Sequence, residues 1–347
     1  MKGMRNMIQM NEVTKIYETK NRLGLFRAET RTVTAVQSLT LSIAKGEIVG
    51  LLGLNGAGKT TTIRMLSTLL DPTSGSIEID GMPMADNRRS VQQKVNMIAG
   101  GERMLYWRLT GRENLQYFGR LYGLNTAKIR SLSDLLLAEV GLTAAADQPV
   151  EQYSKGMKQR LQIARGLIND PEYLFLDEPT LGLDAPIARQ LRSTVRSLAK
   201  EHGKGILLTS HYLQEVEELC DRVYVLNRGR LLLCDKPDAI VRQVAGLQTA
   251  HLQVSGWDEA LRPLLQEHLG KLGHPAELIG GVKDSDGNSA SRSEESYRIS
   301  VRSTSADMLI TELLPWTMQY GLRINGFTCD KPNLEDAIIL LSEGRVS

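Results

Sequence analysis

A glycine-rich segment, Gly53–Thr60, has the residue types and spacing of a phosphate-binding loop. It reads Gly-Leu-Asn-Gly-Ala-Gly-Lys-Thr, and it follows the apolar run Ile48–Leu52, which predicts a buried strand. The helical stretch Thr60–Leu70 comes directly after it. A glycine-rich turn without a ligand is the alternative, but the strand before the loop and the helix after it favour binding of a nucleoside triphosphate.

Each residue type in this loop has a chemical reason. Glycines let consecutive backbone N–H groups turn inward around a phosphate, and the N-terminus of the helix adds a partial positive charge. Lys59 can reach the β- and γ-phosphates, and Thr60 offers a hydroxyl to Mg²⁺. The expected ATP-binding residues of the loop are Gly53, Asn55, Gly56, Ala57, Gly58, Lys59, Thr60 and Thr61.

Two carboxylates, Asp177 and Glu178, follow the apolar run Tyr173–Leu176, which predicts a strand buried on both faces. Ligands bind at the carboxyl ends of strands in open α/β sheets. Asp177 can hold the hydration shell of Mg²⁺, and Glu178 can orient or deprotonate an attacking water. An ordinary surface strand end is the alternative for this run by itself, and the upstream phosphate loop favours the hydrolytic role.

The segment Tyr153–Arg160 runs into the helical pattern Leu161–Ile168. Ser154 is a natural N-cap, which leaves free N–H groups and the positive end of the helix dipole pointing outward. This arrangement predicts a second anion-binding site in the same chain. A capped helix without a ligand is the alternative, and this segment by itself favours that alternative.

The bulk composition is that of an ordinary globular protein with room for two domains. The chain has 347 residues, 41% of them hydrophobic and 24% charged, and its net charge of +2 gives no electrostatic argument for nucleic-acid binding. Cys220, Cys234 and Cys329 lie far apart, which fits thiols in a reducing cytosol better than disulfides. No apolar stretch approaches the ~20 residues of a membrane span, and Met1–Met10 lacks the apolar core of a signal peptide.

Apolar runs that alternate with helical patterns predict an α/β fold for residues 1–245. Strands are expected over Ile8–Tyr17, Thr32–Ile43, Ser76–Asp80, Gly205–Thr209 and Val223–Leu226. The polar and basic stretch Glu18–Arg31 is interpreted as a surface loop. Helical spacing from Thr110 to Leu142 predicts a helical subdomain over about residues 102–165.

The pattern changes near residue 245, and residues 246–347 are interpreted as a smaller α+β domain. Strands are predicted over His251–Val254, Tyr297–Val301 and Leu322–Phe327, and helices over Trp257–Leu272, Ser305–Tyr320 and Asn333–Leu341. The polar, small-residue segment Asp284–Glu295 has no periodicity and predicts a mobile loop.

With these motifs in place, the chain resembles the ATP-binding-cassette (ABC) ATPases, a family of phosphate-loop NTPases. The resemblance covers Met7 to Asp235, and its motifs occur in the family's order: Gly53–Thr60, Tyr153–Met157, Tyr173–Glu178, Leu181–Asp184 and Ser210–His211. In that family, ATP is held between the phosphate loop of one subunit and the signature segment of another.

The resemblance therefore implies roles for single residues. Ser154 and Gly156 would contact ATP across a dimer interface, together with Lys155 and Asp184 as interface residues, and His211 would touch the γ-phosphate. A lone histidine after a strand is otherwise more often structural. Tyr17 matches the position at which the family stacks an aromatic ring on adenine; an ordinary strand tyrosine is the alternative.

One departure from the family pattern concerns the Mg²⁺ site. ABC ATPases usually carry a glutamine ahead of the helical subdomain, and Gly101 stands at that position here. Glu102 or a water molecule can supply the missing oxygen. The pair Tyr106–Trp107 is expected to dock a membrane partner, because aromatic residues beside arginine anchor interfaces; packing in the core is the alternative.

Shorter matches resemble the exporter ATPases of the drug-resistance and sodium-efflux type. They are the variant signature Tyr153–Met157, the segment Gly100–Arg103, Glu113–Leu115, and Pro332–Asp336. This resemblance implies a homodimer or paired ABC subunit at the cytoplasmic face of the membrane, bound to a separate permease, with ATP and Mg²⁺ as cofactors. By the same analogy, the C-terminal domain would be regulatory or would stabilise the dimer.

The alternative is a soluble ABC ATPase that acts on ribosomes or DNA. Such proteins usually fuse two cassettes or carry long coiled-coil insertions, and this sequence shows neither feature. The sequence therefore predicts a transporter subunit that binds no nucleic acid.

Overall fold

The computed structural model describes residues 6–22, 28–99, 105–244, 248–271, 276–284, 296–303, 306–330 and 333–342. The chain divides into two compact units, Met1–Pro237 and Asp238–Ser347. The division falls at the start of helix α8 (Pro237–Val244), whereas the sequence-based boundary is residue 245.

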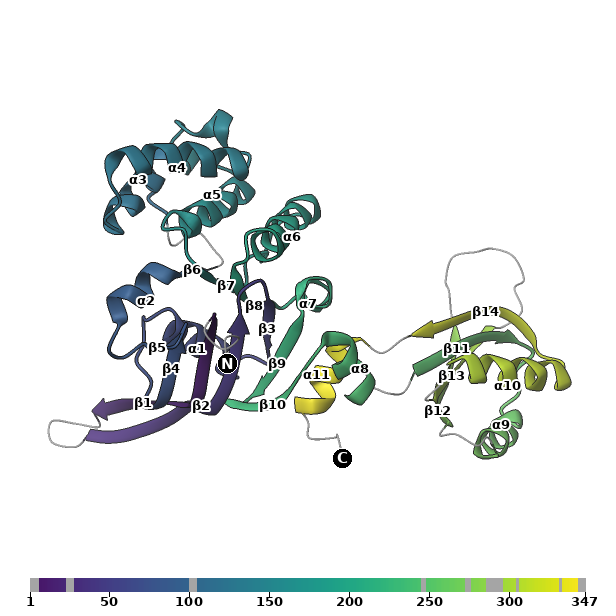
Figure 1. Ribbon diagram of the computed structural model, residues 1–347. Helices are drawn as coiled ribbons and strands as arrows, with labels where there is room; N and C mark the ends of the chain where they lie inside the picture. The colour runs from purple at the N-terminus through teal and green to yellow at the C-terminus, as the bar shows by residue number, and fades with distance from the viewer. Residues whose placement is uncertain are drawn as a thin grey trace. The chain divides into compact units, whose positions relative to one another are not determined.

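The first unit contains a six-stranded sheet that carries the phosphate loop (Figure 1). Its strands, in spatial order, are β10 (Arg230–Asp235), β9 (Arg222–Asn227), β3 (Ile48–Leu52), β8 (Gly205–Thr209), β7 (Tyr173–Asp177) and β6 (Val95–Ala99). Strands β9, β3, β8, β7 and β6 are parallel, and β10 pairs antiparallel with β9. The carboxyl ends of β3 and β7 therefore meet at the same edge of the sheet, as ligand binding there requires.

A second, antiparallel sheet packs on the first. Its strands, in spatial order, are β2 (Ala28–Ala44), β1 (Met7–Arg22), β4 (Ser74–Ile79) and β5 (Met82–Pro83). Helix α1 (Lys59–Leu66) joins both sheets in one apolar core, because Ile63 and Leu66 are buried with Ile8 of β1 and Phe175 of β7. This core makes the helix that follows the phosphate loop a rigid support.

The predicted helical subdomain is a group of three helices, α3 (Gly111–Leu121), α4 (Thr126–Glu139) and α5 (Lys155–Leu167) (Figure 1). A capping box starts α3, since Thr110 accepts from the Glu113 N–H and Glu113 accepts from the Thr110 N–H. Two single 3₁₀ turns, Thr143–Ala145 and Val150–Gln152, connect α4 to α5. The remaining helices of the first unit are α2 (Arg88–Lys94), α6 (Ala185–Lys200) and α7 (Leu213–Leu219).

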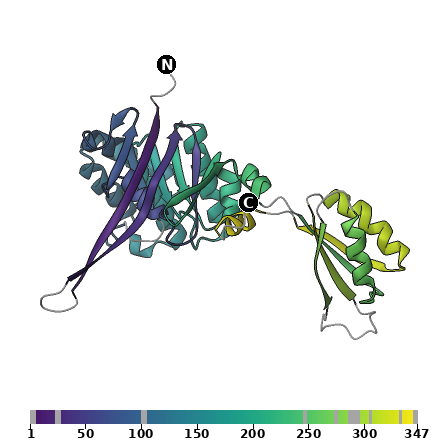
Figure 2. The same cartoon turned by 90° about the horizontal axis from the view of Figure 1, so that it is seen from below.

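The loop predicted over Glu18–Arg31 is wrong for most of its length. Strands β1 and β2 form a long hairpin in which Glu18 pairs with Thr32 and Asn21 pairs with Glu29 (Figure 2). The polar composition of this stretch is compatible with a ladder because backbone hydrogen bonds can join two strands of any composition.

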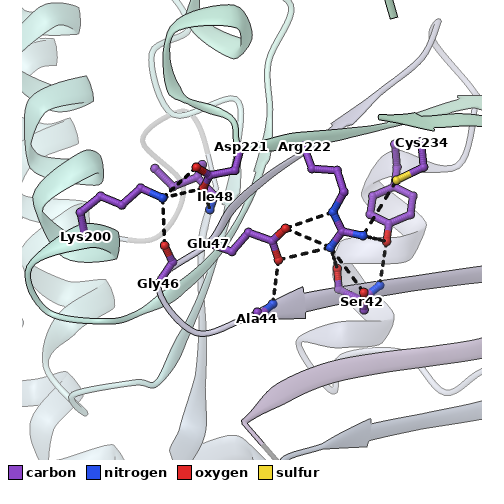
Figure 3. Close-up of polar contacts among 10 residues, drawn as sticks. Ser42, Ala44, Gly46, Glu47, Ile48, Lys200, Asp221, Arg222 and Cys234 are labelled. Atoms are coloured by element: carbon purple, nitrogen blue, oxygen red, sulfur yellow. Dashed lines mark hydrogen bonds and ion pairs between the residues drawn. The ribbon is translucent and has the colours of Figure 1, made fainter. Parts of the chain in front are cut away.

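A polar network fixes the start of β3, the strand that leads into the phosphate loop (Figure 3). Arg222 donates to Glu47 at 3.0 Å and to the backbone oxygen of Ser42 in β2 at 3.1 Å. Beside it, Asp221 accepts from the Ile48 N–H at 2.8 Å and from Lys200 of α6 at 2.7 Å. These contacts tie the first end of β3 to β2, β9 and α6, so they hold in place the strand that leads into the loop.

The second unit contains an antiparallel sheet in the order β12-β13-β11-β14. Its chain order is β11 (Gln248–Ser255), α9 (Leu261–Gly270), β12 (Ala276–Asp284), β13 (Ser296–Ser303), α10 (Ala306–Gln319) and β14 (Arg323–Asp330), a split βαβ pattern that confirms the predicted α+β class. Leu252, Ile299 and Trp316 are buried in its core. Helix α11 (Leu334–Ser342) completes this unit, and most of the predicted loop Asp284–Glu295 lies outside the described residues.

Candidate ATP site

The predicted phosphate loop lies between β3 and α1, as expected. All five residues of β3 are buried, and α1 begins at Lys59. The first N–H groups of a helix have no partner within the helix, so this end of α1 offers donors to an anion. Thr60 is exposed at this end, where its hydroxyl is accessible.

Two glycines of the loop are required by close contacts within the chain, in addition to any contact with a ligand. Gly53 has φ +146°, and a Cβ there would lie 2.2 Å from the carbonyl oxygen of Leu226. Gly58 has φ +103°, and a Cβ there would lie 2.5 Å from the carbonyl oxygen of Ala35. A Cβ on Gly56 would meet no atom within 4 Å. The backbone of the loop is therefore wedged between β9 and β2 at two of its three glycines.

Lys59 is directed into its own loop. The residue is 8% exposed, and Nζ donates to the carbonyl oxygens of Gly53 at 2.6 Å and of Leu54 at 3.3 Å. Burial lowers the pKa of the Lys59 ammonium, and the negative charges of Glu178 and Asp177 partly oppose that shift. The structure thus brings the lysine of the loop into the electrostatic field of both predicted carboxylates.

The two carboxylates and the histidine form one cluster at the ends of β7 and β8. Thr209 at the end of β8 donates to Asp177 at 2.7 Å, and the Glu178 N–H donates to the Thr209 carbonyl at 3.0 Å. His211 Nε2 lies 2.7 Å from Glu178 Oε1. Glu178 has φ +53°, a strained conformation for a residue with a Cβ, and such strain concentrates at functional sites. Thr209 was not predicted from the sequence, although its hydroxyl orients Asp177.

The oxygen donors present fit Mg²⁺. Mg²⁺ is usually held by one or two protein oxygens, with phosphates and water as the other ligands. Thr60 and Asp177 provide a hydroxyl and a carboxylate of this kind. The described residues contain no group of three or more His, Cys, Asp and Glu side chains that could hold a metal without a substrate. Gly101 and Glu102 lie outside the described residues.

Ser154 caps α5, as predicted, and accepts from the Met157 N–H at 3.2 Å. The side chains of Ser154, Lys155 and Asp184 are exposed, so all three are accessible to another molecule. Gly156 is buried instead, and a Cβ there would lie 2.4 Å from Cδ1 of Ile187 in α6. This contact gives Gly156 a packing role within the chain, whatever its backbone contacts across an interface.

The aromatic candidates differ in exposure. Tyr17 is partly buried in β1, where it pairs with Val33, and Lys15 Nζ lies 5.7 Å from its ring centre. Tyr106 and Trp107 are 47% and 50% exposed, so the interpretation of this pair as core residues is wrong. Lys158 of α5 lies 4.9 Å from the Trp107 ring centre.

A search of the described helices for a membrane span found none with sufficient length and apolar character.

Comparison with known proteins gives one consistent family. A family model described as ABC transporter matches residues 36–181. The chain is 43% identical over 207 residues to the ABC transporter ATP-binding protein NatA of Bacillus subtilis strain 168, which covers 60% of this chain and 84% of NatA. It is 31% identical over 336 residues to the Linearmycin resistance ATP-binding protein LnrL of the same organism, which covers 97% of this chain and 98% of LnrL.

A solved structure described as an ATP binding subunit of an ABC transporter shares 31% sequence identity and a TM-score of 0.58, over 69% of this chain and 94% of that chain. These findings confirm the resemblance that the motifs predicted, and they favour a transporter subunit over an ATPase that acts on ribosomes or nucleic acid. The chain therefore belongs to the ABC transporter family, as one of its ATP-binding and ATP-hydrolysing subunits.

Proposed function

We propose that this chain energises export through a separate membrane permease, on the cytoplasmic face of the membrane. The observation that supports a second subunit in this proposal is the exposure of Ser154, Lys155 and Asp184, while Glu178 and His211 already lie in contact within one chain. The similarity to LnrL, a protein named for linearmycin resistance, extends over 97% of the chain and so includes the second unit.

In this proposal, two copies of the chain, or this chain and a related subunit, enclose ATP between the loop of one copy and Ser154 of the other. Lys59 neutralises the terminal phosphates, Glu178 takes the proton of the attacking water, and His211 contacts the γ-phosphate. Thr60 and Asp177 would hold Mg²⁺, which supplies charge neutralisation between the phosphates, and Glu102 is a further candidate ligand.

The surface proposed to face the permease includes Tyr106 and Trp107. Exposed aromatic rings that are held in place are typical anchors of protein interfaces, and the Tyr106 hydroxyl lies 3.2 Å from that of Tyr117. The second unit would regulate the ATPase or stabilise the dimer.

The proposal is tested by purification of the chain from its own cells after mild solubilisation of the membrane. We expect it to co-purify with a polytopic membrane protein encoded beside it, and to hydrolyse ATP only when Mg²⁺ is present. Recovery with ribosomes in salt-resistant complexes, with no membrane protein, would contradict the proposal.

Replacement of Tyr17 separates adenine stacking from an ordinary strand role. We expect Tyr17→Ala to weaken ATP binding by about 1–3 kcal/mol, roughly 5- to 150-fold in Kd, because a stacked base loses its aromatic partner. Tyr17→Phe keeps the ring and is expected to bind ATP normally. Titration calorimetry with ATP and with inorganic triphosphate provides the measurement, since triphosphate lacks adenine and its binding would stay unchanged in both variants. If Tyr17→Ala weakened the binding of ATP and of triphosphate equally, Tyr17 would act only through the fold.

A further inference from the structure

A buried carboxylate, Glu215, lies behind the hydrolytic residues and belongs to none of the motifs described above. It is on α7, the helix that follows β8 and the His211 turn (Figure 1). Glu215 is 3% exposed. Burial raises the pKa of the Glu215 carboxyl, and hydrogen bonds from Ser210 and Thr180 oppose that shift. A buried carboxylate needs hydrogen-bond donors, and Ser210 and Thr180 are two such donors.

Both donors reach the same oxygen of Glu215. The Ser210 hydroxyl donates to Oε2 at 2.6 Å, and the Thr180 hydroxyl donates to Oε2 at 2.9 Å. Ser210 and Thr180 are 5% and 3% exposed, so water does not compete for these hydrogen bonds. Hydrogen bonds to a charged group in a buried site are stronger and shorter than those between neutral groups.

The two donors come from the two segments that carry the hydrolytic residues. Ser210 directly precedes His211, and its Oγ also accepts from the Tyr212 N–H at 3.0 Å, which fixes the turn on both sides of the histidine. Thr180 lies in the turn after Glu178, where the Leu181 N–H donates to the Glu178 carbonyl at 3.2 Å. One carboxylate oxygen therefore joins the Glu178 turn to the His211 turn.

We propose that Glu215 is a positioning residue that fixes the Glu178 and His211 turns at the separation needed for ATP hydrolysis. It acts from behind the site, through Thr180 and Ser210, and touches neither nucleotide nor water. The 2.7 Å contact between His211 and Glu178 is the geometry that it maintains. This inference rests on the hydrolytic roles proposed for Glu178 and His211.

The test compares variants that remove the carboxylate or one donor at a time. We expect Glu215→Ala to lower kcat for ATP by about 10- to 100-fold, because a shift of about 1 Å in catalytic groups has effects of that size. The Kd for ATP is expected to change by less than about threefold, since Lys59 and the loop glycines are untouched. Thr180→Val and Ser210→Ala are each expected to lower kcat while ATP binding is retained, and Thr180→Ser, which keeps the hydroxyl, is expected to restore it.

Non-additivity separates positioning from a general structural role. If the three residues act as one unit, the triple variant Thr180→Val/Ser210→Ala/Glu215→Ala loses no more kcat than Glu215→Ala does by itself. Glu217→Gln, an exposed position on the same helix, is the matched control and is expected to keep wild-type turnover. Should Glu215→Ala not fold, the two single-donor variants still decide the question through the split between kcat and Kd.

Wild-type kcat in the donor variants, or equal losses of kcat and ATP affinity, would overturn the positioning role. Loss of turnover in Glu178→Gln alongside normal turnover in Glu215→Ala would overturn this inference and leave the proposed function intact. Normal turnover in Glu178→Gln would instead contradict the hydrolytic role on which both rest.

Discussion

We expect the Glu178→Gln variant to hydrolyse ATP about 10²- to 10⁴-fold more slowly than the wild type, which is the usual contribution of a general base. Glutamine has nearly the same shape as glutamate and can accept a hydrogen bond from His211, but it cannot take a proton from water. The backbone conformation at φ +53° is available to both side chains equally. Lys59 and the loop glycines remain, so ATP is still bound.

The same substitution is expected to trap a dimer with ATP enclosed, because the step that reopens it is lost. Steady-state phosphate release measures turnover, and size-exclusion chromatography with light scattering measures the mass with ATP, with ADP and without nucleotide. Glu139→Gln, at an exposed position on α4, is the control for the loss of one negative charge. Turnover near the wild-type rate in Glu178→Gln would remove this residue from the role of base.

A mixture of two inactive variants is expected to regain activity if the site is shared between copies. Lys59→Ala lacks the ammonium proposed to bind phosphate, and Ser154→Arg would block the N-terminus of α5. In a mixed dimer, one site combines the intact Lys59 of one copy with the intact Ser154 of the other, while the second site carries both substitutions. With equal mixing, half of the dimers are mixed and hold one good site of two, so activity of about one quarter of the wild type is expected.

Two controls define this experiment. Asn125→Arg, which replaces the exposed N-cap of α4, introduces the same side chain at an equivalent cap and is expected to keep activity. Lys59→Ala mixed with the Lys59→Ala/Ser154→Arg double variant has no complete site and is expected to stay inactive. If the first mixture also stays inactive, or if isolated monomers bind ATP as tightly as dimers do, the shared site is contradicted.

The positions of Lys59, Asp177, Glu178 and His211 at one sheet edge could be predicted because each follows a buried parallel strand or lies within a local motif. Thr209, Thr180 and Glu215 could not. Their roles depend on which strands are neighbours and on which side chains face inward, and no short spacing in the sequence records either property. The Glu215 network joins positions 35 residues apart.

The dependence on neighbouring strands also explains why two elements were mispredicted. The β1–β2 hairpin is polar outside its core-facing part, so its composition indicates a loop although its backbone forms a ladder. Strand β12 was not predicted because Gly280 and Gly281 interrupt the alternation of its side chains, and the ladder has a register shift at this point. In both places, pairing with a neighbouring strand outweighs local propensity.

The packing of the phosphate loop limits which of its residues can change during evolution. Gly53 and Gly58 face carbonyl oxygens of Leu226 and Ala35, so the fold rejects a side chain at either position even without a nucleotide. A duplicated copy that drifted after losing ATPase activity would keep both glycines. Its loss of activity would be expected to show at Lys59, because burial disfavours the charge of this residue and the role proposed for that charge is to bind phosphate. Glycines at positions 53 and 58 in a related sequence would therefore indicate that the fold is kept, whereas a lysine at position 59 would indicate that ATP binding is kept.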